Sequence, residues 1–142
     1  MLGLLTSTFD SVRQVILSDY DPGCLSLLQT NIELNSNAYP IPMSKCSVIE
    51  YKWGTNPNTL LAYKQDGYDL VIGSDLLYCV EIVSPLFTSV SQLLKADLGL
   101  FILVSSFDTG EVSAIHMQAH SYTYTICVYY LLIIYVRSCF VL

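Results

Sequence analysis

The stretch Tyr68–Tyr78 constrains the fold most, because it joins a short apolar strand to a group of polar residues. Its run Leu70–Ile72 is continuously hydrophobic, which is typical of a strand buried on both faces inside a parallel sheet. In open sheets of alternating strands and helices, ligands bind just beyond the carboxyl ends of the strands. Asp75 and Tyr78 lie at that position. The alternative is structural: Asp75 caps the next helix, and Tyr78 packs with its hydroxyl bonded.

Apolar residues recur along the chain with helical and strand periods in alternation. The pattern predicts helices near residues 2–11, 22–34 and 85–94, a helical turn at 60–63, and strands at 14–17, 45–50, 70–72 and 100–104. Such alternation indicates right-handed crossovers between parallel strands. We therefore expect an α/β protein with a mostly parallel sheet and helices on both faces.

Two of the predicted helices share a start signal, a capping residue followed by proline. These pairs are Asp21-Pro22 and Ser84-Pro85. The second helix carries a wide apolar stripe, and Lys95 follows it, where a cation favours the negative end of the helix dipole. The stripe consists of Val83, Leu86, Phe87, Val90, Leu93 and Leu94.

The charge and cysteine content exclude several classes of function. The 142 residues carry a formal net charge of −6, without a run of Lys or Arg, so binding to nucleic acid or anionic lipid is not expected. The five cysteines are widely spaced and form no Cys-x-x-Cys, which indicates reduced thiols in a cytoplasmic protein, with the nucleus as an alternative. A metal site at His116 and His120 lacks a third ligand other than Glu111, so no metal is expected.

The C-terminal region departs from the alternating pattern. We expect a domain over residues 1–107 and an atypical tail over 108–142, polar at first and then hydrophobic. The uncharged run Ile126–Val136 within 122–142 is shorter than the roughly 20 apolar residues of a membrane helix. A buried strand or an aggregation-prone tail is therefore expected in preference to a membrane span.

Three predicted strands are followed by groups that could hold a ligand. Asp19 follows the first, Trp53-Gly54 the second, and Asp75 the third. A carboxylate after a strand can accept both hydroxyls of a ribose, and an aromatic ring can stack on a purine. A further carboxylate could hold or deprotonate an amine. Together these residues describe a nucleoside-bearing cofactor beside a reacting nitrogen, although Asp19 alone would suit a turn and Trp53 the core.

Four segments of the sequence resemble methyltransferase family 16. They are Val15-Ile16-Leu17-Ser18-Asp19-Tyr20-Asp21-Pro22, Asn31-Ile32-Glu33-Leu34-Asn35, Glu50-Tyr51-Lys52-Trp53-Gly54 and the stretch Tyr68–Tyr78. The Asp-x-x-Tyr motif of the family is matched by Asp75-Leu76-Leu77-Tyr78. The resemblance implies a partial Rossmann-like domain and transfer of a methyl group from S-adenosylmethionine to a protein lysine.

The resemblance also implies roles for individual residues. Asp19 would bind the cofactor ribose, and Trp53 with Gly54 would border the adenine. Asp75 would lie beside the methionine part of the cofactor and the incoming lysine, and Tyr78 would shape the lysine pocket. Asp75 and Tyr78 are therefore the candidate catalytic residues.

The resemblance begins after the Gly-rich loop that holds the amino-acid end of the cofactor in this family. Gly3 alone does not replace that loop, and Lys52 stands where an acidic residue is common. The sequence thus predicts an incomplete methyltransferase domain. The alternative is a non-catalytic fragment that acts, if at all, as a protein-binding module.

Overall fold

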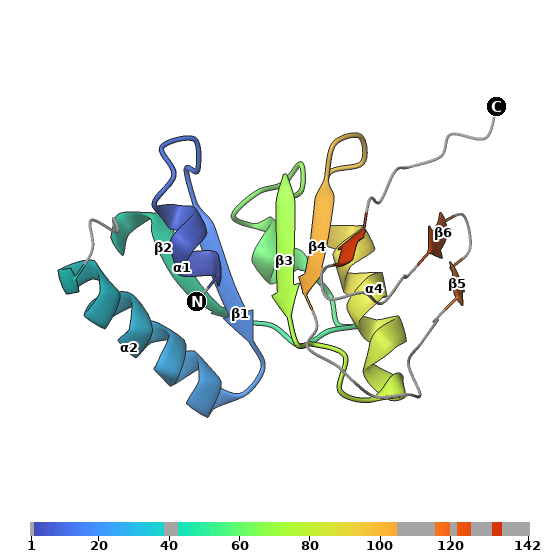
Figure 1. The fold of residues 1–142 in the computed structure, drawn as a ribbon, viewed down its shortest axis with the longest axis horizontal. Coiled ribbons are helices and arrows are strands. Elements are labelled where there is room, and N and C mark those ends of the chain that lie inside the picture. The colour runs from blue at the N-terminus through green and yellow to red at the C-terminus, as the bar shows by residue number, and fades with distance from the viewer. Residues whose placement is uncertain (1, 39–42, 105–115, 120–121, 126–131, 135–142) are drawn as a thin grey trace. The chain divides into compact units, whose positions relative to one another are not determined.

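The computed structural model describes residues 2–38, 43–104, 116–119, 122–125 and 132–134 (Figure 1). Its contacts divide the chain into two compact units, Met1–Leu60 and Leu61–Leu142. Each unit is described by itself. The predicted domain boundary at residue 107 lies outside the described residues and stays a prediction. The same holds for the predicted strand or tail at residues 126–131 and 135–136 of the uncharged run.

The first unit is built on two parallel strands. Its elements are α1 (Leu2–Ser7), β1 (Val15–Asp19), α2 (Pro22–Ala38), the 3-10 turn η1 (Met43–Lys45), β2 (Cys46–Glu50) and α3 (Asn58–Leu61), which reaches the boundary of the unit. β1 and β2 pair in parallel from Val15 opposite Cys46 to Asp19 opposite Glu50. Among the described strands, β2 is the one that pairs with β1.

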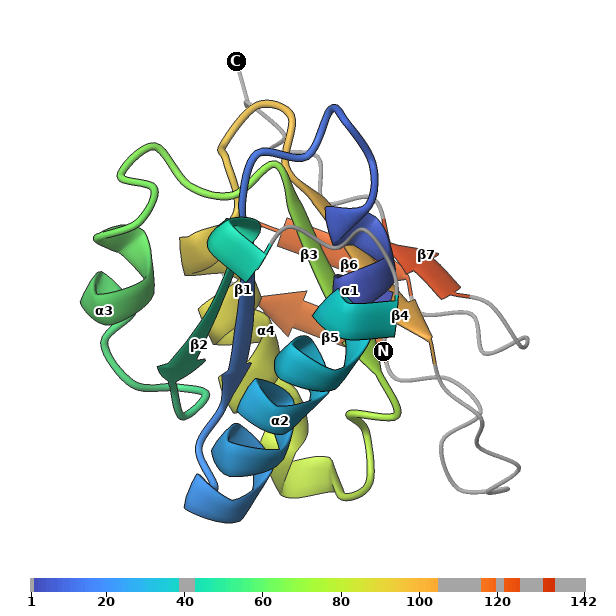
Figure 2. The ribbon, with the colours of Figure 1, turned by 90° about the vertical axis from the view of Figure 1, so that its left-hand side faces the viewer.

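The helices α1 and α2 pack on one face of the strand pair (Figure 2). Leu4 of α1 and Ile32 of α2 are buried together against Leu17, Cys46 and Val48. The predicted cap of α2 is confirmed, because the backbone N–H of Cys24 donates to Asp21 Oδ1 at 3.0 Å. Capping of this kind stabilises a helix by about 1 kcal/mol.

The second unit contains the central strand. Its elements are β3 (Leu70–Ser74), the 3-10 turn η2 (Val80–Ile82), α4 (Val83–Leu93), β4 (Leu100–Val104), β5 (His116–Ala119), β6 (Tyr122–Thr125) and β7 (Leu132–Ile134). β3 and β4 are parallel, as their arrows show in Figure 1, and β7 pairs antiparallel with β4. β5 and β6 form a separate antiparallel pair. The prediction of an α/β fold with parallel strands is confirmed.

The core of the second unit lies between α4 and the strands. All six residues of the predicted stripe are buried, namely Val83, Leu86, Phe87, Val90, Leu93 and Leu94. The ring of Phe87 meets the ring of Phe101 edge to face, with centroids 5.9 Å apart. Phe101 and Leu103 of β4 are fully buried. Burial of such side chains contributes about 1.5–3 kcal/mol each.

Two predictions of helix ends differ from the structure. The first helix ends at Ser7 rather than near residue 11, and Phe9 beyond it is exposed. Ser84 does not cap α4, which begins at Val83 and has no side-chain cap. The reason is η2, whose 3-10 turn already gives the N–H of Val83 a partner, the carbonyl of Val80. Pro85 lies in the first helical turn, where its missing N–H costs nothing.

Lys95 follows the end of α4, as expected, and it also forms ion pairs that the sequence did not indicate. Its Nζ atom lies 2.6 Å from Asp69 Oδ1 and 3.4 Å from Asp66 Oδ2, so it forms ion pairs at the start of β3. The backbone adds to this connection, because the N–H of Lys95 donates to the carbonyl of Tyr68 at 3.1 Å. Lys95 thus joins the segment after α4 to the start of the central strand.

Candidate functional site

The end of β1 holds Asp19 in a defined orientation. Its Oδ1 atom accepts the backbone N–H groups of Tyr20 at 2.7 Å and Asp21 at 2.9 Å. Its backbone carbonyl accepts the N–H of Tyr51 at 2.8 Å, which extends the pairing with β2. Both side-chain hydrogen bonds engage Oδ1, so Oδ2 can accept a hydrogen bond from a ligand. Asp19 therefore forms the turn and also presents a fixed acceptor at the carboxyl end of the strand.

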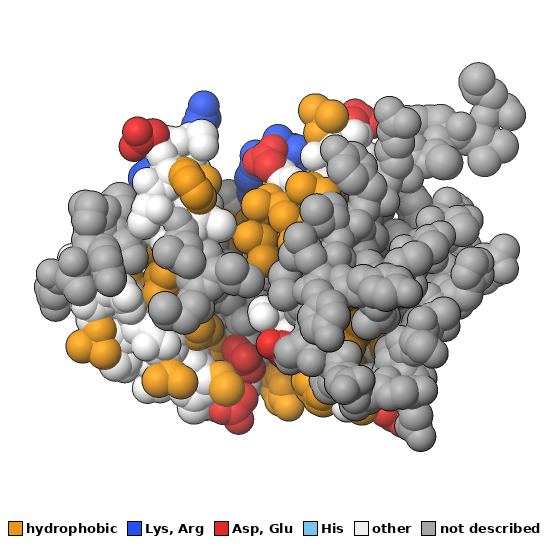
Figure 3. Space-filling model, in the orientation of Figure 1, with side chains coloured by type: hydrophobic (Ala, Val, Ile, Leu, Met, Phe, Trp, Pro, Cys, Tyr) orange, Lys and Arg blue, Asp and Glu red, His pale blue; other side chains and the backbone are white. Residues whose placement is uncertain are grey.

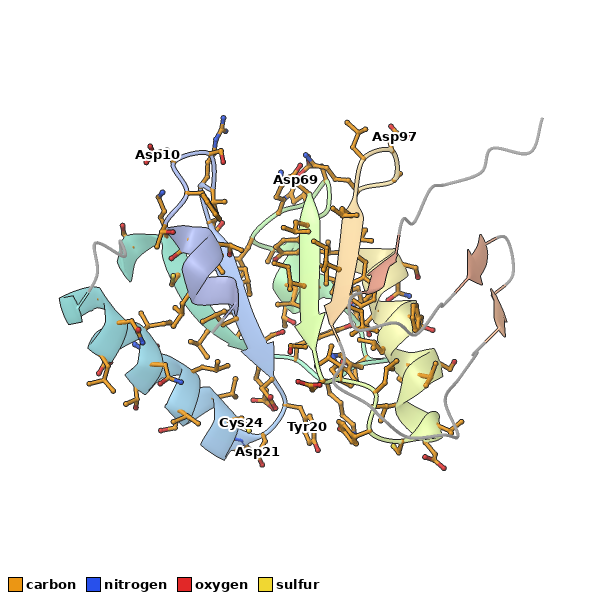
Figure 4. The ribbon with its side chains drawn as sticks, in the orientation of Figure 1. Asp10, Tyr20, Asp21, Cys24, Asp69 and Asp97 are labelled. Atoms are coloured by element: carbon orange, nitrogen blue, oxygen red, sulfur yellow. The ribbon has the colours of Figure 1, made fainter. Side chains whose placement is uncertain are left out.

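The region where β1 ends and α2 begins is electronegative. Figure 4 shows Tyr20, Asp21 and Cys24 there. The pKa of the exposed Cys24 thiol is raised, mainly by the negative charge of Asp19, then by desolvation and by Asp21. Such a field disfavours a phosphate and favours neutral hydroxyls or a cation. The carboxylate acceptors and the negative field thus suit a nucleoside without a phosphate group.

The segment after β2 is a tight turn that carries Trp53. Thr55 closes it by donating its N–H to the carbonyl of Lys52 at 3.2 Å. Gly54 has φ of +79°, a left-handed conformation that glycine adopts without strain. A side chain also braces the turn, because the hydroxyl of the buried Tyr51 donates to the carbonyl of Thr55 at 3.1 Å. Trp53 is only half-buried in this turn, so it is not a residue of the closed core.

In the second unit, Asp75 and Tyr78 lie in the turn that follows β3. Asp75 has φ of +53°, the one positive value among the described non-glycine residues. Its Oδ2 atom accepts the hydroxyl of Ser74 at 3.3 Å. The cap position of η2 belongs to Cys79 without a side-chain bond, so Asp75 does not cap the next helix. Tyr78 is 60% exposed rather than packed in the core.

The opposite end of β3 carries a cluster of alternating charges. Lys64 lies 3.1 Å from Asp66 Oδ1, and Lys95 contacts both Asp66 and Asp69. The hydrogen bond from Lys95 lowers the pKa of Asp69, and that from Lys64 lowers the pKa of Asp66. Figures 3 and 4 show this end of the strand, with Lys and Asp side chains together above the start of β3 and Asp69 labelled.

Charge is therefore divided between the two ends of β3. Within the described stretch 61–104, both cationic residues, Lys64 and Lys95, belong to the cluster at the start of the strand. The segment after the strand carries the carboxylates Asp75 and Glu81. The carboxyl end of β3 thus attracts cations without competition from a lysine of the same stretch.

The structure brings the predicted site residues together in two sets. Asp19 and Trp53 with Gly54 follow two paired strands of the first unit, and Asp75 and Tyr78 share one turn of the second. Convergence of the two sets stays a prediction. Tyr20 was not among the predicted site residues, yet it follows Asp19 directly and is 56% exposed. The only available signal was an aromatic residue within a polar cluster after a strand.

No metal site is found in the part of the chain that the structure describes. His116 lies in the strand β5, so the helical spacing considered for it and His120 does not apply, and His120 is outside the described residues. Separately, none of the described helices combines the length and apolar character needed to cross a bilayer.

Comparison with known proteins adds the family. Residues 1–119 match the methyltransferase family 16, which is described as lysine methyltransferase. A curated protein of Emericella nidulans, called protein N-terminal and lysine N-methyltransferase efm7, is 27% identical over 107 residues. That similarity covers 70% of this chain and 41% of the relative, so the chain spans about two fifths of the relative's length. With most of its length matched, the chain belongs to the lysine methyltransferase family 16.

Proposed function

We propose that this protein binds S-adenosylmethionine and takes part in methyl transfer to an amine of a protein substrate, in the first place a lysine. The observation that carries the proposal is the placement of oriented carboxylates at the carboxyl ends of parallel strands. Asp19 is fixed by two backbone N–H groups, and Asp75 stands in a strained turn away from the lysines of its unit. Strained backbone outside glycine is concentrated at functional sites.

The residues of the first unit suit the nucleoside part of this cofactor. Asp19 Oδ2 would accept the ribose hydroxyls, and the half-buried Trp53 would offer its ring to the adenine. Gly54, lacking a side chain, would leave room beside the base. The electronegative field that raises the pKa of Cys24 is compatible with a positively charged cofactor. When bound, S-adenosylmethionine supplies an electrophilic methyl group.

The residues of the second unit suit the amine. Asp75 would accept a hydrogen bond from the amine nitrogen and thereby orient its lone pair, while the ring of Tyr78 would contact the aliphatic stem of the lysine. Lysine has a pKa near 10.4 in water, so the ammonium must lose a proton before it can attack. A carboxylate beside the nitrogen can receive or pass on that proton.

The substrate class follows from the family and from the named relative. The name of the relative mentions both protein N-termini and lysines. An α-amine and a lysine ε-amine share the chemistry that Asp75 would recognise, whereas the lysine stem gives Tyr78 an additional contact. We therefore place the lysine first and treat the N-terminal amine as the second outcome of the experiment.

Binding of the cofactor is the first test. Trp53 is the only tryptophan of the chain, so its fluorescence reports directly on the proposed adenine site. Titration with S-adenosylmethionine should quench Trp53 and release heat, and Asp19→Asn should weaken binding about tenfold or more. Asp21→Asn is the matched control, because asparagine also caps helices well. Absence of heat and of quenching at millimolar cofactor would refute the proposal.

Methyl transfer is the second test. The protein is incubated with methyl-labelled cofactor and proteins from cells that lack the gene, and labelled residues are identified by mass spectrometry. Label on lysines is expected, and Asp75→Asn should remove it, whereas Asp97→Asn in the turn before β4 should not. Label confined to N-terminal amines would select the second substrate class. Label that persists in Asp75→Asn would contradict the role of this carboxylate.

A non-catalytic, protein-binding function is favoured by one observation on α2. Leu27 and Leu34 are about 60% exposed and lie two turns apart on the same side of the helix. The helix has one charged residue, Glu33. This function predicts that Leu27→Lys abolishes capture of a partner protein while cofactor binding is unchanged.

We also propose a cytoplasmic location, with the nucleus as the alternative. The proposal is supported by Cys24, Cys46 and Cys79, which are free thiols in the structure. Proteins in oxidising compartments usually pair their cysteines. Fractionation of cells that express the tagged chain separates these compartments, and recovery in the secretory pathway would overturn the proposal.

A further inference from the structure

Gly73, the fourth residue of β3, has an unusual neighbour. It is buried and pairs with Leu103 of β4. A Cβ atom added to Gly73 would overlap Leu76 Cδ1, and it would lie 3.1 Å from Leu76 Cγ and 3.3 Å from Leu103 Cδ1. The side chain of Leu76 thus fills the space that a side chain of residue 73 would otherwise occupy. We call this space the Gly73 seat.

The chain must reverse sharply for Leu76 to reach a residue three positions earlier. Asp75 lies inside this reversal and has the left-handed φ of +53°. Leu76 is half-buried and Leu77 is buried, whereas Asp75 and Tyr78 on either side of the leucine pair are exposed. Two outward functional groups therefore flank two leucines that face the protein interior.

We infer that Leu76, seated over Gly73, is the positioning residue that holds Asp75 in its left-handed conformation and directs its carboxylate to the amine. The inference rests on the proposed function for the role of the carboxylate, but the seat itself is a property of the turn. A left-handed conformation is unfavourable for aspartate in isolation. Packing of the Leu76 side chain against Gly73 compensates for it, because this apolar contact exists only when the chain turns back.

The same geometry explains why residue 73 is glycine. Its backbone conformation is not left-handed, so another residue could adopt it. The requirement is for space: even the methyl group of alanine would occupy the position of Leu76 Cδ1. Gly73→Ala should therefore act on Asp75 from two residues away without touching it.

The experiment measures the conformation of Asp75 directly. Three variants of the full chain are compared by NMR: Leu76→Ala, Gly73→Ala and the conservative Leu76→Met, whose flexible side chain can still enter the seat. The three-bond coupling between HN and Hα and the Cα chemical shift of residue 75 report its φ. Both should show a left-handed residue in the native protein and in Leu76→Met, and lose that signature in the other two variants.

Leu93→Ala is the matched control for general destabilisation. Leu93 is buried like a core leucine but lies at the end of α4, where its carbonyl accepts the N–H of Tyr68 before β3 begins. This variant should keep the left-handed signature of Asp75. If Leu76→Ala does not fold, Leu76→Val, which lacks the δ-methyl groups, tests the same contact. A left-handed Asp75 that persists in both Gly73→Ala and a folded Leu76 variant would overturn the inference.

Methyl transfer separates this inference from the proposed function. Leu76→Ala and Gly73→Ala should lower the rate of lysine labelling about as much as Asp75→Asn does, by roughly tenfold or more, whereas Leu76→Met should restore it to within about twofold. If the native protein does not bind the cofactor, the proposed function fails, yet the NMR signature still decides whether Leu76 positions Asp75. If Asp75→Asn lowers the labelling rate but the two seat variants do not, the positioning role is wrong and the proposed function stands.

Discussion

Replacement of Asp75 by glycine and by alanine should give stabilities in the reverse of their usual order. Asp75 has a left-handed backbone, which costs a residue with a Cβ atom about 1–2 kcal/mol. Alanine keeps this cost, and glycine removes it. At ordinary positions glycine is the less stable of the two, by about 0.4–1 kcal/mol, because it gains more freedom in the unfolded chain.

The magnitude follows from the difference between these two effects. Both variants lose the hydrogen bond from Ser74 to the carboxylate, so that contribution cancels in the comparison. Relief of about 1–2 kcal/mol of strain exceeds the entropic cost of glycine, so Asp75→Gly should be more stable than Asp75→Ala by about 1 kcal/mol. Both variants should lose function, because neither carries a carboxylate.

Hydrogen exchange of the β3 and β4 amides is the suitable assay, since it reports opening of the second unit alone. A difference of about 1 kcal/mol corresponds to a roughly fivefold difference in exchange rate. The matched control is Ser74, the exposed neighbour with an ordinary strand conformation. There alanine should be the more stable of the two. If Asp75→Ala equals or exceeds Asp75→Gly in stability, the left-handed backbone of Asp75 carries no such strain.

Three further predictions concern other parts of the chain. Because Lys95 lowers the folded pKa of Asp69, the pair stabilises the protein above the unfolded pKa of the carboxyl group and loses this contribution as the pH falls through the lowered value. Lys95→Met should remove that part of the pH dependence in acid titrations followed by circular dichroism, and an unchanged profile would contradict the prediction. Cys24 should react slowly with iodoacetamide at pH 8, because its raised pKa leaves less of the thiol ionised. Asp19→Asn removes the main negative charge and should accelerate the reaction, whereas equal rates by peptide mass spectrometry would argue against the electronegative field. Gly67→Ala should lower the free energy of unfolding in urea by about 2 kcal/mol or more, because φ is +86° and the new methyl group would lie 2.9 Å from backbone atoms of Leu94 and Lys95. A variant as stable as the wild type would show that the turn adapts.

The strands and the main helix of the second unit were predictable because their signals are strong. A continuous apolar run at Leu100–Val104 and a helical stripe from Val83 to Leu94 each have one plausible structure. The cap at Asp21 was also predictable, since its side chain bonds locally. By contrast, Ser84-Pro85 has the same sequence signal, but Ser84 does not cap α4. The preceding 3-10 turn already gives the N–H of Val83 a hydrogen-bond acceptor, and such turns leave little trace in sequence periodicity.

The candidate site was predictable in its residue types but not in its conformations. Strand ends drew attention to Asp19 and Asp75 because parallel sheets bind ligands there. The left-handed backbone of Asp75 depends on a contact between Leu76 and Gly73, which requires coordinates to detect. The exposure of Tyr20 and the pairing of Lys95 with Asp69 likewise depend on tertiary arrangement.

Within the described residues of the first unit, the pairing of β1 with β2 alone leaves one border of the strand open. Because Asp19 bonds toward β2, the alternate residues Ile16 and Ser18 direct their backbone amide and carbonyl groups to the other side of the strand. The strand contains neither proline nor lysine, the residues that commonly protect such borders. In the first unit taken by itself, this border therefore offers main-chain groups that a further strand can bond, whatever the side chains of that strand.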